Sequence, residues 1–490
     1  MAYANQAKLA LSAEAATRLL TGWRRGTGST ASRLAAALRA AIDRGELLPE
    51  TRLPPERDLA RALDVGRGTV AAAYGKLLRA ETIERRQGSG SWVRTPAVGN
   101  GGGELASRSP HRLASLVGAD DKGSINLQPA SFAMPPGLED LLAEAGRELA
   151  HVSRGHGYLP QGYAPLRRAI AARLSGRGLP TTEDEILVTT GAQQAIALTA
   201  MVLVRPGEFV LLEDPTFPGA IDAYQFVGAR LLAVPVTTNG MDTGAAADAL
   251  DRVEARVVYV TPSFQNPTGT LMPTDARQHL LALAQRHDAV IVEDDTFGEL
   301  AFGTTPLPPI ARFDRDGRVV LVGSLSKIFW GGLRVGWIRA SRHLLGRLGH
   351  AKGVIDLASS LPSQALATAM LRHGHELRRR RIEEARAGLA ALTDLLAKHL
   401  PSWTYTAPAG GLVLWVKLPH GSATEFARMA RQHGVAILPG TAVSPSNAGD
   451  DRIRIPFSAS RTELADAMPR LARAWHAYER SPSARTRVLV

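Results

Sequence analysis

Lys327 stands in a sequence setting that suits covalent chemistry. It follows Ser326 and precedes a stretch of apolar and glycine residues, just after the apolar run 319–322 that should form a strand. At the carboxyl end of a buried strand an ammonium loses hydration, which lowers its pKa, and the neutral amine can then form a Schiff base with an aldehyde. Lysines are usually surface charges, but only seven of the 58 basic residues here are lysines. We therefore expect Lys327 to anchor an aldehyde.

Several other polar groups suit an aldehyde that carries a phosphate. Ser324 and Ser326 offer hydroxyl groups, and Arg334 offers a guanidinium that can clamp an anion. The turn Gly191-Ala192-Gln193 opens an apolar helical run, so its backbone N–H groups can face a phosphate at a helix N-terminus. The turn is a weak signal alone, and it gains weight from the residues around Lys327.

Three residues that end or follow predicted strands suit a pyridine ring. Asp294 ends the run 290–292 and can keep a pyridine nitrogen protonated, unless it is an ordinary loop carboxylate. Asn266 follows the run 257–260 and can bond a phenolic oxygen, unless it only makes a turn. Phe217 can stack on the ring, unless it is a core residue. Lys327 and Asp294 are thus the two candidate catalytic residues.

The elements that must position these residues alternate along the chain. Continuous apolar runs at 209–212, 257–260, 289–292 and 319–322 are separated by helical stretches. This pattern predicts an α/β body whose parallel sheet is covered on both faces, in a large lobe at about residues 145–345. Strands at 411–416 and 452–455 indicate a smaller α+β lobe, and the whole body should span residues 124–480.

Residues 1–96 have a different pattern and should form an α+β domain of the winged helix-turn-helix type. We expect one helix over 33–42, a second that starts at Pro55 and ends near Leu63, and a third from Arg67. Residues 83–86 and 91–94, joined by the turn 87–90, should form a two-stranded wing. The second helix of such a pair lies in the major groove of DNA.

Charge supports a DNA partner for this domain. Residues 1–95 hold 16 Lys and Arg against 9 Asp and Glu, out of a formal net charge of +12 for the whole chain. A basic end on a near-neutral body favours a nucleic-acid contact, although a solvated basic surface has the same composition. The residues that we expect to contact double-stranded DNA are Arg57, Arg67, Thr69, Tyr74, Arg85, Arg86 and Gly88.

Composition limits the remaining choices. Residues 97–123, which include Gly101-Gly-Gly103, predict a flexible linker between the two parts. The chain has no cysteine, which excludes disulfides and thiolate metal sites, and we expect no metal. The longest apolar run, 195–204, is about half a membrane span, and no secretion signal is visible. We expect a cytoplasmic, nucleoid-associated protein with no membrane contact.

Each part resembles a known family. Residues 30–95 resemble the GntR regulators through Leu53-Pro-Pro-Glu-Arg57 and Gly88-Ser-Gly90. Residues 124–478 resemble the fold-type-I enzymes of the aspartate aminotransferase superfamily, through Ser324-Leu-Ser-Lys327 followed by Gly-Leu-Arg334. That resemblance implies pyridoxal 5'-phosphate (PLP) on Lys327. It also implies a carboxylate-binding role for Arg454, and a homodimer in which Tyr158 reaches the partner's phosphate.

The chain departs from that family after Asp294. The family usually has a tyrosine there whose hydroxyl bonds the cofactor's phenolic oxygen, whereas this chain has Phe297, and Thr296 is the nearest hydroxyl that can replace it. We therefore expect the lysine–cofactor bond to be tuned differently from that of an efficient transaminase.

The order of winged helix-turn-helix domain, linker and aminotransferase-like body resembles the MocR family of bacterial regulators. The resemblance implies that PLP on Lys327 senses an amino compound, or is itself the signal, and changes DNA binding or transcription. The alternative is a working PLP-dependent aminotransferase with an accessory DNA reader. The sequence leaves open the effector, the operator, the target genes and the sign of regulation.

Overall fold

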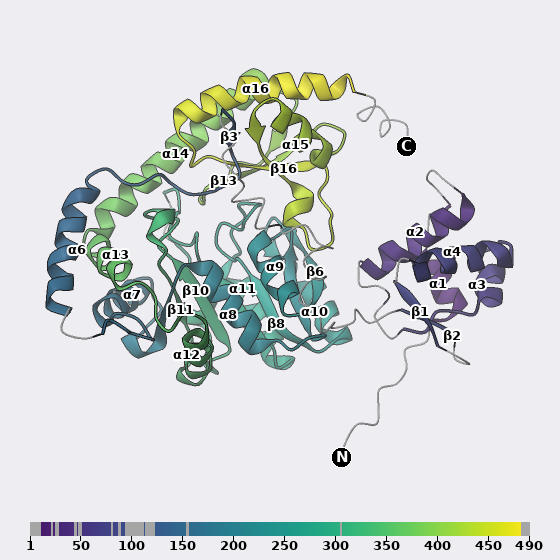
Figure 1. The fold of residues 1–490 in the computed structure, drawn as a ribbon, viewed down its shortest axis with the longest axis horizontal. Coiled ribbons are helices and arrows are strands. Elements are labelled where there is room, and N and C mark those ends of the chain that lie inside the picture. Colours follow the sequence, from purple (N-terminus) through teal and green to yellow (C-terminus); the bar gives the residue numbers. More distant parts are fainter. Residues whose placement is uncertain are drawn as a thin grey trace, which may run out of the picture. The chain divides into compact units, whose positions relative to one another are not determined.

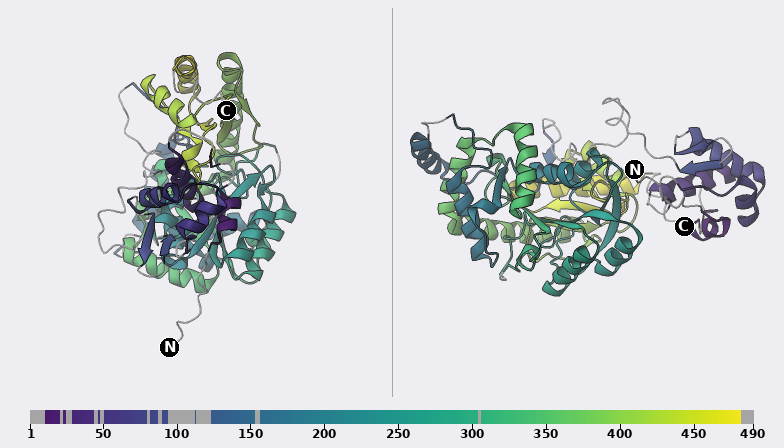
Figure 2. Two further views of the ribbon diagram at one scale, coloured as in Figure 1. Left: turned by 90° about the vertical axis from the view of Figure 1, so that its right-hand side faces the viewer. Right: turned by 90° about the horizontal axis from the view of Figure 1, so that it is seen from below.

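A computed structural model describes residues 11–20, 23–24, 29–43, 47, 51–79, 82–86, 90–93, 112, 123–152, 156–303 and 306–481. The chain forms two compact units, Met1–Gly103 and Glu104–Val490, which Figures 1 and 2 draw from three sides. Most of the predicted linker 97–123 lies outside the described residues. No helix among the described residues is long and apolar enough to cross a membrane.

The described residues of the first unit form four helices and a two-stranded sheet. Its elements are α1 (Ala13–Leu19), α2 (Thr30–Asp43), α3 (Glu56–Ala62), α4 (Arg67–Arg79), β1 (Ile83–Arg86) and β2 (Gly90–Val93). The strands pair antiparallel, with Ile83 opposite Val93. Leu34, Leu38, Leu59 and Val70 are buried together, so the helices share one apolar core. The helix-turn-helix and the wing lie where predicted, except that Pro55 caps α3 from outside it, and α1 was not expected.

The second unit is built on an eight-stranded mixed sheet with the order β4-β11-β10-β9-β8-β5-β6-β7. The strands are β4 (Ile186–Thr189), β5 (Phe209–Asp214), β6 (Arg230–Thr237), β7 (Gly240–Met241), β8 (Ala255–Val260), β9 (Val290–Asp294), β10 (Val319–Ser324) and β11 (Gly336–Arg339). The central strands β10, β9, β8, β5 and β6 are parallel. The strands β4, β11 and β7 pair antiparallel, so the parallel prediction holds for the centre and not for the edges.

Helices cover both faces of this sheet, as continuous apolar strands require. One face carries α8 (Ala192–Leu203), α9 (Pro218–Phe226) and α12 (Arg342–Asp356). The other carries α7 (Ala164–Gly176), α10 (Thr243–Arg252), α11 (Thr274–Arg286) and α13 (Leu361–Arg372), with α6 (Leu138–Val152) beside α13. Because α12 contacts β4 and α13 packs on α7 in the core of the large lobe, this lobe extends beyond the predicted limit near residue 345.

The smaller lobe has its own core. A four-stranded sheet of order β12-β13-β16-β15 contains β12 (Thr404–Tyr405), β13 (Val413–Lys417), β16 (Arg452–Pro456) and β15 (Leu438–Pro439). The helices α14 (Gly374–His399), α15 (Ala423–Gln432) and α16 (Arg461–Glu479) contribute buried residues to the same core. A parallel pair joins β3 (Ile125–Asn126) to β14 (Val435–Ala436), so the chain enters the body through this lobe. Figure 1 shows α14 running from the large lobe to the small one.

Candidate functional site

Lys327 lies just past the carboxyl end of β10, where the side chains of a parallel sheet meet a ligand. Its Nζ donates a hydrogen bond to the backbone oxygen of Ala130 at 2.7 Å. Burial, followed by the positive charge of Arg454, lowers the pKa of Lys327 to about 8, although Asp294 opposes this shift. Near neutral pH the amine is therefore uncharged far more often than that of an ordinary lysine, as a Schiff-base lysine requires.

An anion cradle lies at the start of α8. Gly191 precedes the helix with φ +101°, and the first N–H groups of a helix have no partner within it. Arg334, in the left-handed region at φ +53°, donates from Nη2 to the oxygen of Thr190 at 2.7 Å. A Cβ on Gly191 would lie 2.9 Å from that same Nη2, so only glycine lets the arginine sit there.

The predicted hydroxyl groups differ in their contacts. Ser324 Oγ lies 3.3 Å from the oxygen of Val335 and accepts from the backbone N–H of Ser326. Ser326 Oγ is buried and has no hydrogen-bond partner among the described residues. Gln193 donates from Nε2 to Gly219, and its buried Oε1 is also unpartnered within the described part of the chain. A buried hydroxyl without a partner is costly, so Ser326 suits a ligand oxygen.

Asp294, at the end of β9, is buried, and its two oxygens have different donors. Tyr259 of the neighbouring strand β8 donates to Oδ2 at 2.6 Å, and the backbone N–H of Thr296 donates to Oδ1 at 3.0 Å. Burial raises the pKa of Asp294, and the Tyr259 hydrogen bond opposes the rise. Tyr259 itself is fully buried, and its pKa is far above the usual value for the same reason. Such a carboxylate can hold a proton on a ring nitrogen.

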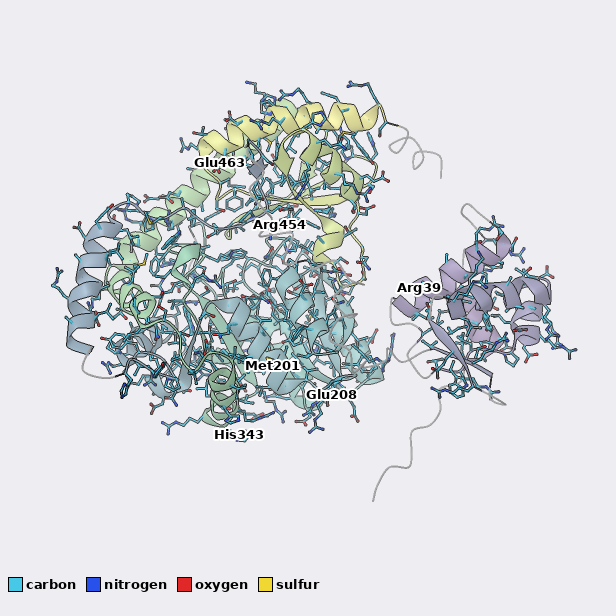
Figure 3. All side chains as sticks on the ribbon, viewed as in Figure 1. Arg39, Met201, Glu208, His343, Arg454 and Glu463 are labelled. Atoms are coloured by element: carbon cyan, nitrogen blue, oxygen red, sulfur yellow. The ribbon has the colours of Figure 1, made fainter. Side chains whose placement is uncertain are left out.

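Arg454 comes from β16 of the small lobe and faces the large lobe (Figure 3). It is only 2% exposed, and burial lowers its pKa to about 10. Its Nη1 lies 3.3 Å from Asn266 Oδ1, and its Nη2 donates to the oxygen of Gln128. Nε has no partner among the described residues. The structure thus brings Asn266 and Arg454 together.

The aromatic positions fall into two kinds. Phe217 caps α9, is half-buried and contacts the residues around Trp415 and Val443, at the junction of the two lobes. Phe297 is 1% exposed and belongs to the core that also holds Phe264. The position that usually carries a tyrosine is therefore an apolar core position here. Thr296, the expected replacement, bonds Asp294 instead.

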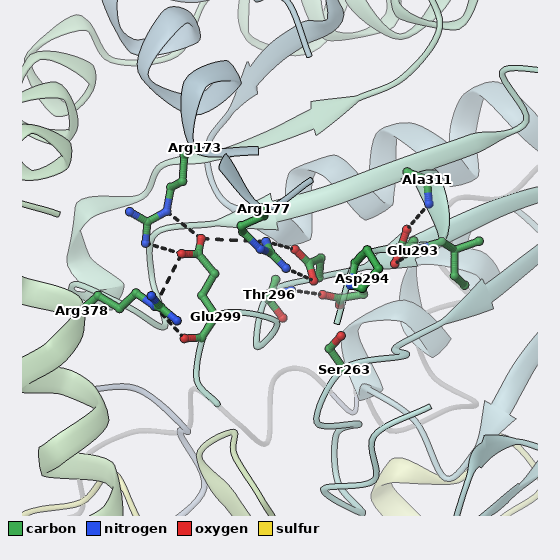
Figure 4. A network of polar contacts seen from close by, with 12 residues as sticks. Arg173, Arg177, Ser263, Glu293, Asp294, Thr296, Glu299, Ala311 and Arg378 are labelled. Carbon is green, nitrogen blue, oxygen red and sulfur yellow. Dashed lines mark hydrogen bonds and ion pairs between the residues drawn. The ribbon is translucent and has the colours of Figure 1, made fainter. Parts of the chain in front are cut away.

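A buried ion-pair network supports the turn that follows Asp294 (Figure 4). Arg177, the residue directly after α7, holds both oxygens of Asp295, at 2.5 and 3.1 Å. Arg173 bonds Glu299 at 2.6 Å, and Arg378 of α14 donates to the backbone oxygen of Glu299 at 3.0 Å. The network connects the Asp294 turn to α14. No sequence motif predicted it.

The first unit presents a second candidate site. Arg67 begins α4 and Arg85 lies on the wing, with side chains 68% and 60% exposed. Both lie near Glu56, at 3.6 and 2.7 Å, so one carboxylate holds the two arginines on the same side of the domain. Arg57 is exposed and Thr69 is half-buried in the first turns of α3 and α4. These positions match a recognition helix and a wing.

The three other predicted DNA contacts, Tyr74, Arg86 and Gly88, are not exposed side chains of this kind among the described residues. Tyr74 is 1% exposed and donates its hydroxyl to the oxygen of Pro54 at 2.8 Å, so the structure makes it a core residue and not a DNA contact. Its burial follows from the helical period, because Tyr74 shares a face of α4 with Val70 and Leu77. Arg86 bonds Glu84 at 2.7 Å and lies over the ring of Trp92. Gly88 lies outside the described residues.

Known families match both units. Residues 138–471 match the model of aminotransferase class I and II. The chain belongs to that family. Residues 30–93 match the gntR family of bacterial regulatory proteins, which makes the whole chain a MocR-type protein: a GntR helix-turn-helix joined to an aminotransferase-like body.

Relatives of both kinds are similar to this chain. The 2-aminoadipate transaminase of Thermus thermophilus is 37% identical over 78% of this chain and 97% of its own length. The probable rhizopine catabolism regulatory protein MocR of Rhizobium meliloti is 30% identical over 81% of this chain and 85% of its own length. Among solved structures, the α-aminoadipate aminotransferase LysN of Thermus thermophilus, complexed with N-(5'-phosphopyridoxyl)-L-leucine, has a TM-score of 0.69. It is 33% identical, over 76% of this chain and 95% of that one.

The cofactor of this aminotransferase family is PLP, and the site fits it. The Lys327 amine, with its lowered pKa, suits the aldehyde, Asp294 suits the pyridine nitrogen, and the cradle at Gly191 with the unpartnered hydroxyl of Ser326 suits the phosphate. The sequence missed Tyr259, Gln128 and Ala130. Tyr259 carried a signal, since its hydroxyl interrupts an apolar strand next to that of Asp294. Gln128 and Ala130 act through their backbone oxygens, so their side chains gave no signal in the sequence.

Proposed function

We propose that this MocR-type protein is a bacterial transcription regulator in which PLP, held by Lys327, senses an amino compound and changes how the GntR unit binds DNA. The observation that carries the proposal is the presence, in one chain, of exposed arginines on a winged helix and of a site that joins the half-buried Lys327 to the buried Asp294 and Arg454. The double-stranded DNA contacts that we propose are Arg57, Arg67, Thr69, Arg85 and Arg86. The nucleoid would then be its place of action.

Each side chain of the site has a proposed task. PLP supplies an aldehyde that condenses reversibly with primary amines. Lys327 offers an amine of lowered pKa, Asp294 keeps the ring nitrogen protonated, and Phe217 lies beside the ring. Gly191, Ala192, Gln193, Ser324, Ser326 and Arg334 hold the phosphate, and Asn266 bonds the phenolic oxygen.

The effector that fits best is an amino compound with a carboxylate. Arg454 is a buried cation whose contacts are a side-chain amide oxygen and a backbone oxygen, and its Nε has no partner in the described part of the chain. An anion therefore gains a charge-assisted hydrogen bond there without displacing another charge. The side chain of the effector is not specified by these contacts.

The segment that leads from the linker into the body links this site to the DNA reader. Gly123 accepts from Arg470 at 3.0 Å, and β3 pairs with β14. Five residues later the same segment accepts from Arg454 at Gln128, and then from Lys327 at Ala130. Any ligand that redirects Arg454 or Lys327 changes the contacts of the chain that continues directly into the linker. The ligand must bind the two arrangements with different affinity for this to alter DNA binding.

We also propose that the protein works as a homodimer. Tyr158, the residue expected to reach a partner's phosphate, is 67% exposed. Val354, Ile355 and Leu357, at the end of α12, are exposed apolar residues, and Gly157 lies near Leu361 just beyond them. Contiguous apolar exposure of this kind suits a second copy of the chain.

The deciding experiment is a screen of amines against the PLP-bound protein, read by visible absorbance and by affinity for a duplex selected from a random DNA library. We expect borohydride to fix the chromophore on Lys327, and one class of amino acid to shift both readouts together. In Lys327→Ala the amine should no longer change DNA affinity. If amines change the spectrum but leave DNA affinity, DNA bending and transcription as they were, the sensing proposal fails. If PLP alone changes DNA affinity, PLP is the signal.

A catalytic aminotransferase is the second candidate. It is favoured by the 37% identity to a 2-aminoadipate transaminase and by a site that keeps Lys327, Asp294, Asn266 and Arg454. Phe297 in the core speaks for slow turnover, because a hydroxyl that tunes the lysine bond in the family is absent there. Steady-state turnover of an amino acid with a 2-oxo acid, at a rate typical of enzymes, would establish this second role.

A further inference from the structure

Lys352 is a buried lysine that the proposed function does not use. It lies on α12, and its side chain is 1% exposed. Its Nζ pairs with Asp356 Oδ1 at 2.7 Å, one helical turn further on. Fully buried lysines are rare unless they are paired, and replacing such a pair by apolar residues often stabilises a protein. The pair therefore calls for an explanation other than stability.

The other oxygen of Asp356 leads to the cofactor loop. Asp356 Oδ2 accepts from Gln194 Nε2 at 2.7 Å, and Gln194 Oε1 accepts from the backbone N–H of Thr190 at 2.8 Å. Thr190 and Gln194 flank the Gly191 turn that starts α8. Three hydrogen bonds thus connect a buried ammonium to the loop that forms the anion cradle.

The order of charges fixes the orientation of the Gln194 amide. An ionised Asp356 is only an acceptor, so Gln194 must turn its NH2 group toward it and its oxygen toward the Thr190 N–H. Lys352, a donor only, holds Asp356 in place. On the opposite side, the oxygen of the same Thr190 accepts from Arg334 at 2.7 Å. Both backbone polar groups of Thr190 are therefore held, which fixes the direction of the N–H groups in the turn that follows.

We propose that Lys352, Asp356 and Gln194 form a positioning chain that aims the start of α8 at the phosphate of PLP. The chain touches no reacting atom and acts through Thr190. This inference rests on PLP being bound at Lys327, and it assigns to α12 a part in cofactor affinity that the motif residues alone do not give. It predicts that breaking these hydrogen bonds weakens the binding of the phosphate group and leaves the binding of the ring and the aldehyde unchanged.

The test compares PLP with pyridoxal, which has the same ring and aldehyde and no phosphate. Dissociation constants of both are measured on apo-protein by absorbance of the Lys327 chromophore. In Asp356→Asn one of the two oxygens that accept from Lys352 and Gln194 becomes a donor. We expect PLP to bind about tenfold more weakly and pyridoxal to change less than about twofold.

A double-mutant cycle tests whether the residues act in series. Lys352→Met should weaken PLP binding by about threefold to tenfold, and the double variant should bind PLP no worse than Asp356→Asn alone. Lys398→Met, an exposed lysine on α14, is the matched control and should leave both constants unchanged. Lys352→Arg keeps the charge and should restore most of the PLP affinity.

A further variant separates a loss of folding from a loss of positioning. If Lys352→Met fails to fold, Gln194→Met, at a half-buried helix start, replaces it in the same PLP-to-pyridoxal comparison. Equal loss of both ligands, or unchanged PLP affinity in folded variants, overturns the inference. Failure of the wild-type protein to bind PLP would instead overturn the proposed function.

Discussion

Arg67 and Arg85 of the helix-turn-helix unit and Arg277 of the body have opposite surroundings. In the helix-turn-helix unit, Arg67 and Arg85 are mostly exposed and are held from one side by a single carboxylate. In the body, Arg277 is fully buried and donates to three backbone oxygens and to Ser263 Oγ. An exposed guanidinium is free to exchange its partner for a phosphate, whereas a buried one fixes the backbone around it. The chain has 51 arginines. Arg67 and Arg85 can exchange their carboxylate for a ligand, whereas Arg277 holds the backbone around it.

Arg277→Met should give the largest effect and tests the buried side of this comparison. Arg277 donates to the oxygens of Met272, Pro262 and Pro308 and to Ser263, at 2.9–3.0 Å, and so holds the loop that carries Asn266. Methionine fills the volume but leaves these acceptors without donors. We expect the unfolding free energy of the body to fall by about 3–5 kcal/mol.

Urea unfolding followed by tryptophan fluorescence measures this loss. Arg252→Met is the control, because its side chain on α10 is exposed and pairs only loosely with Asp248. It should change stability by less than about 0.5 kcal/mol. Equal losses in the two variants would remove the distinction between buried and exposed arginines.

Arg67→Ala tests the exposed side. We expect DNA affinity to fall about tenfold to a hundredfold, since the residue lies at the start of the recognition helix, and stability to change by less than about 0.5 kcal/mol. Fluorescence anisotropy with a labelled duplex measures the affinity. Arg79→Ala, at the far end of the same helix, is the control. A loss of stability in Arg67→Ala as large as that in Arg277→Met would contradict the comparison.

Lys327 provides a pH test of the buried charges. Its pKa is lowered from 10.5 to about 8, so the amine is mostly protonated below pH 8 and mostly neutral above it. The rate at which apo-protein binds PLP should therefore rise with pH and level off above about pH 8, when followed by absorbance. Since the charge of Arg454 contributes to the lowered pKa, Arg454→Gln should move the midpoint upward. A midpoint that stays in place would mean that burial alone sets the pKa.

The smallest effect concerns the wing. Arg85→Ala should reduce the salt slope of DNA binding by about one, as expected for the loss of one phosphate contact. Both guanidinium groups pair with a carboxylate at 2.7 Å, but that of Arg86 also lies over the ring of Trp92 and is less exposed. Arg86→Ala should therefore reduce the slope less. Affinities measured between low and moderate salt give both slopes. The reverse order would place Arg86, and not Arg85, against the backbone of DNA.

Local sequence determined much of this protein. The apolar runs predicted the central strands β5, β8, β9 and β10 but not β6, and continuous apolar strands are stable only with helices on both faces. The string around Lys327 and the pattern at Leu53–Arg57 predicted the candidate cofactor lysine and the GntR unit, since each depends on residues that are neighbours in the sequence. Tyr74 was misjudged because a motif position does not report on which side of a helix the core lies.

Tertiary structure alone decided the contacts that make the site specific. Ala130 meets Lys327, and Gln128 meets Arg454, across 197 and 326 residues of chain. Every residue has a backbone oxygen, so neither composition nor spacing predicts which of them will accept a hydrogen bond from the site. The hydrogen bonds that connect Lys352 to Thr190 likewise join α12 to α8. These two helices come together only when both cover the same face of the sheet. The sequence thus predicts which lysine is the candidate, and the fold supplies the groups that bond Lys327 and lower its pKa.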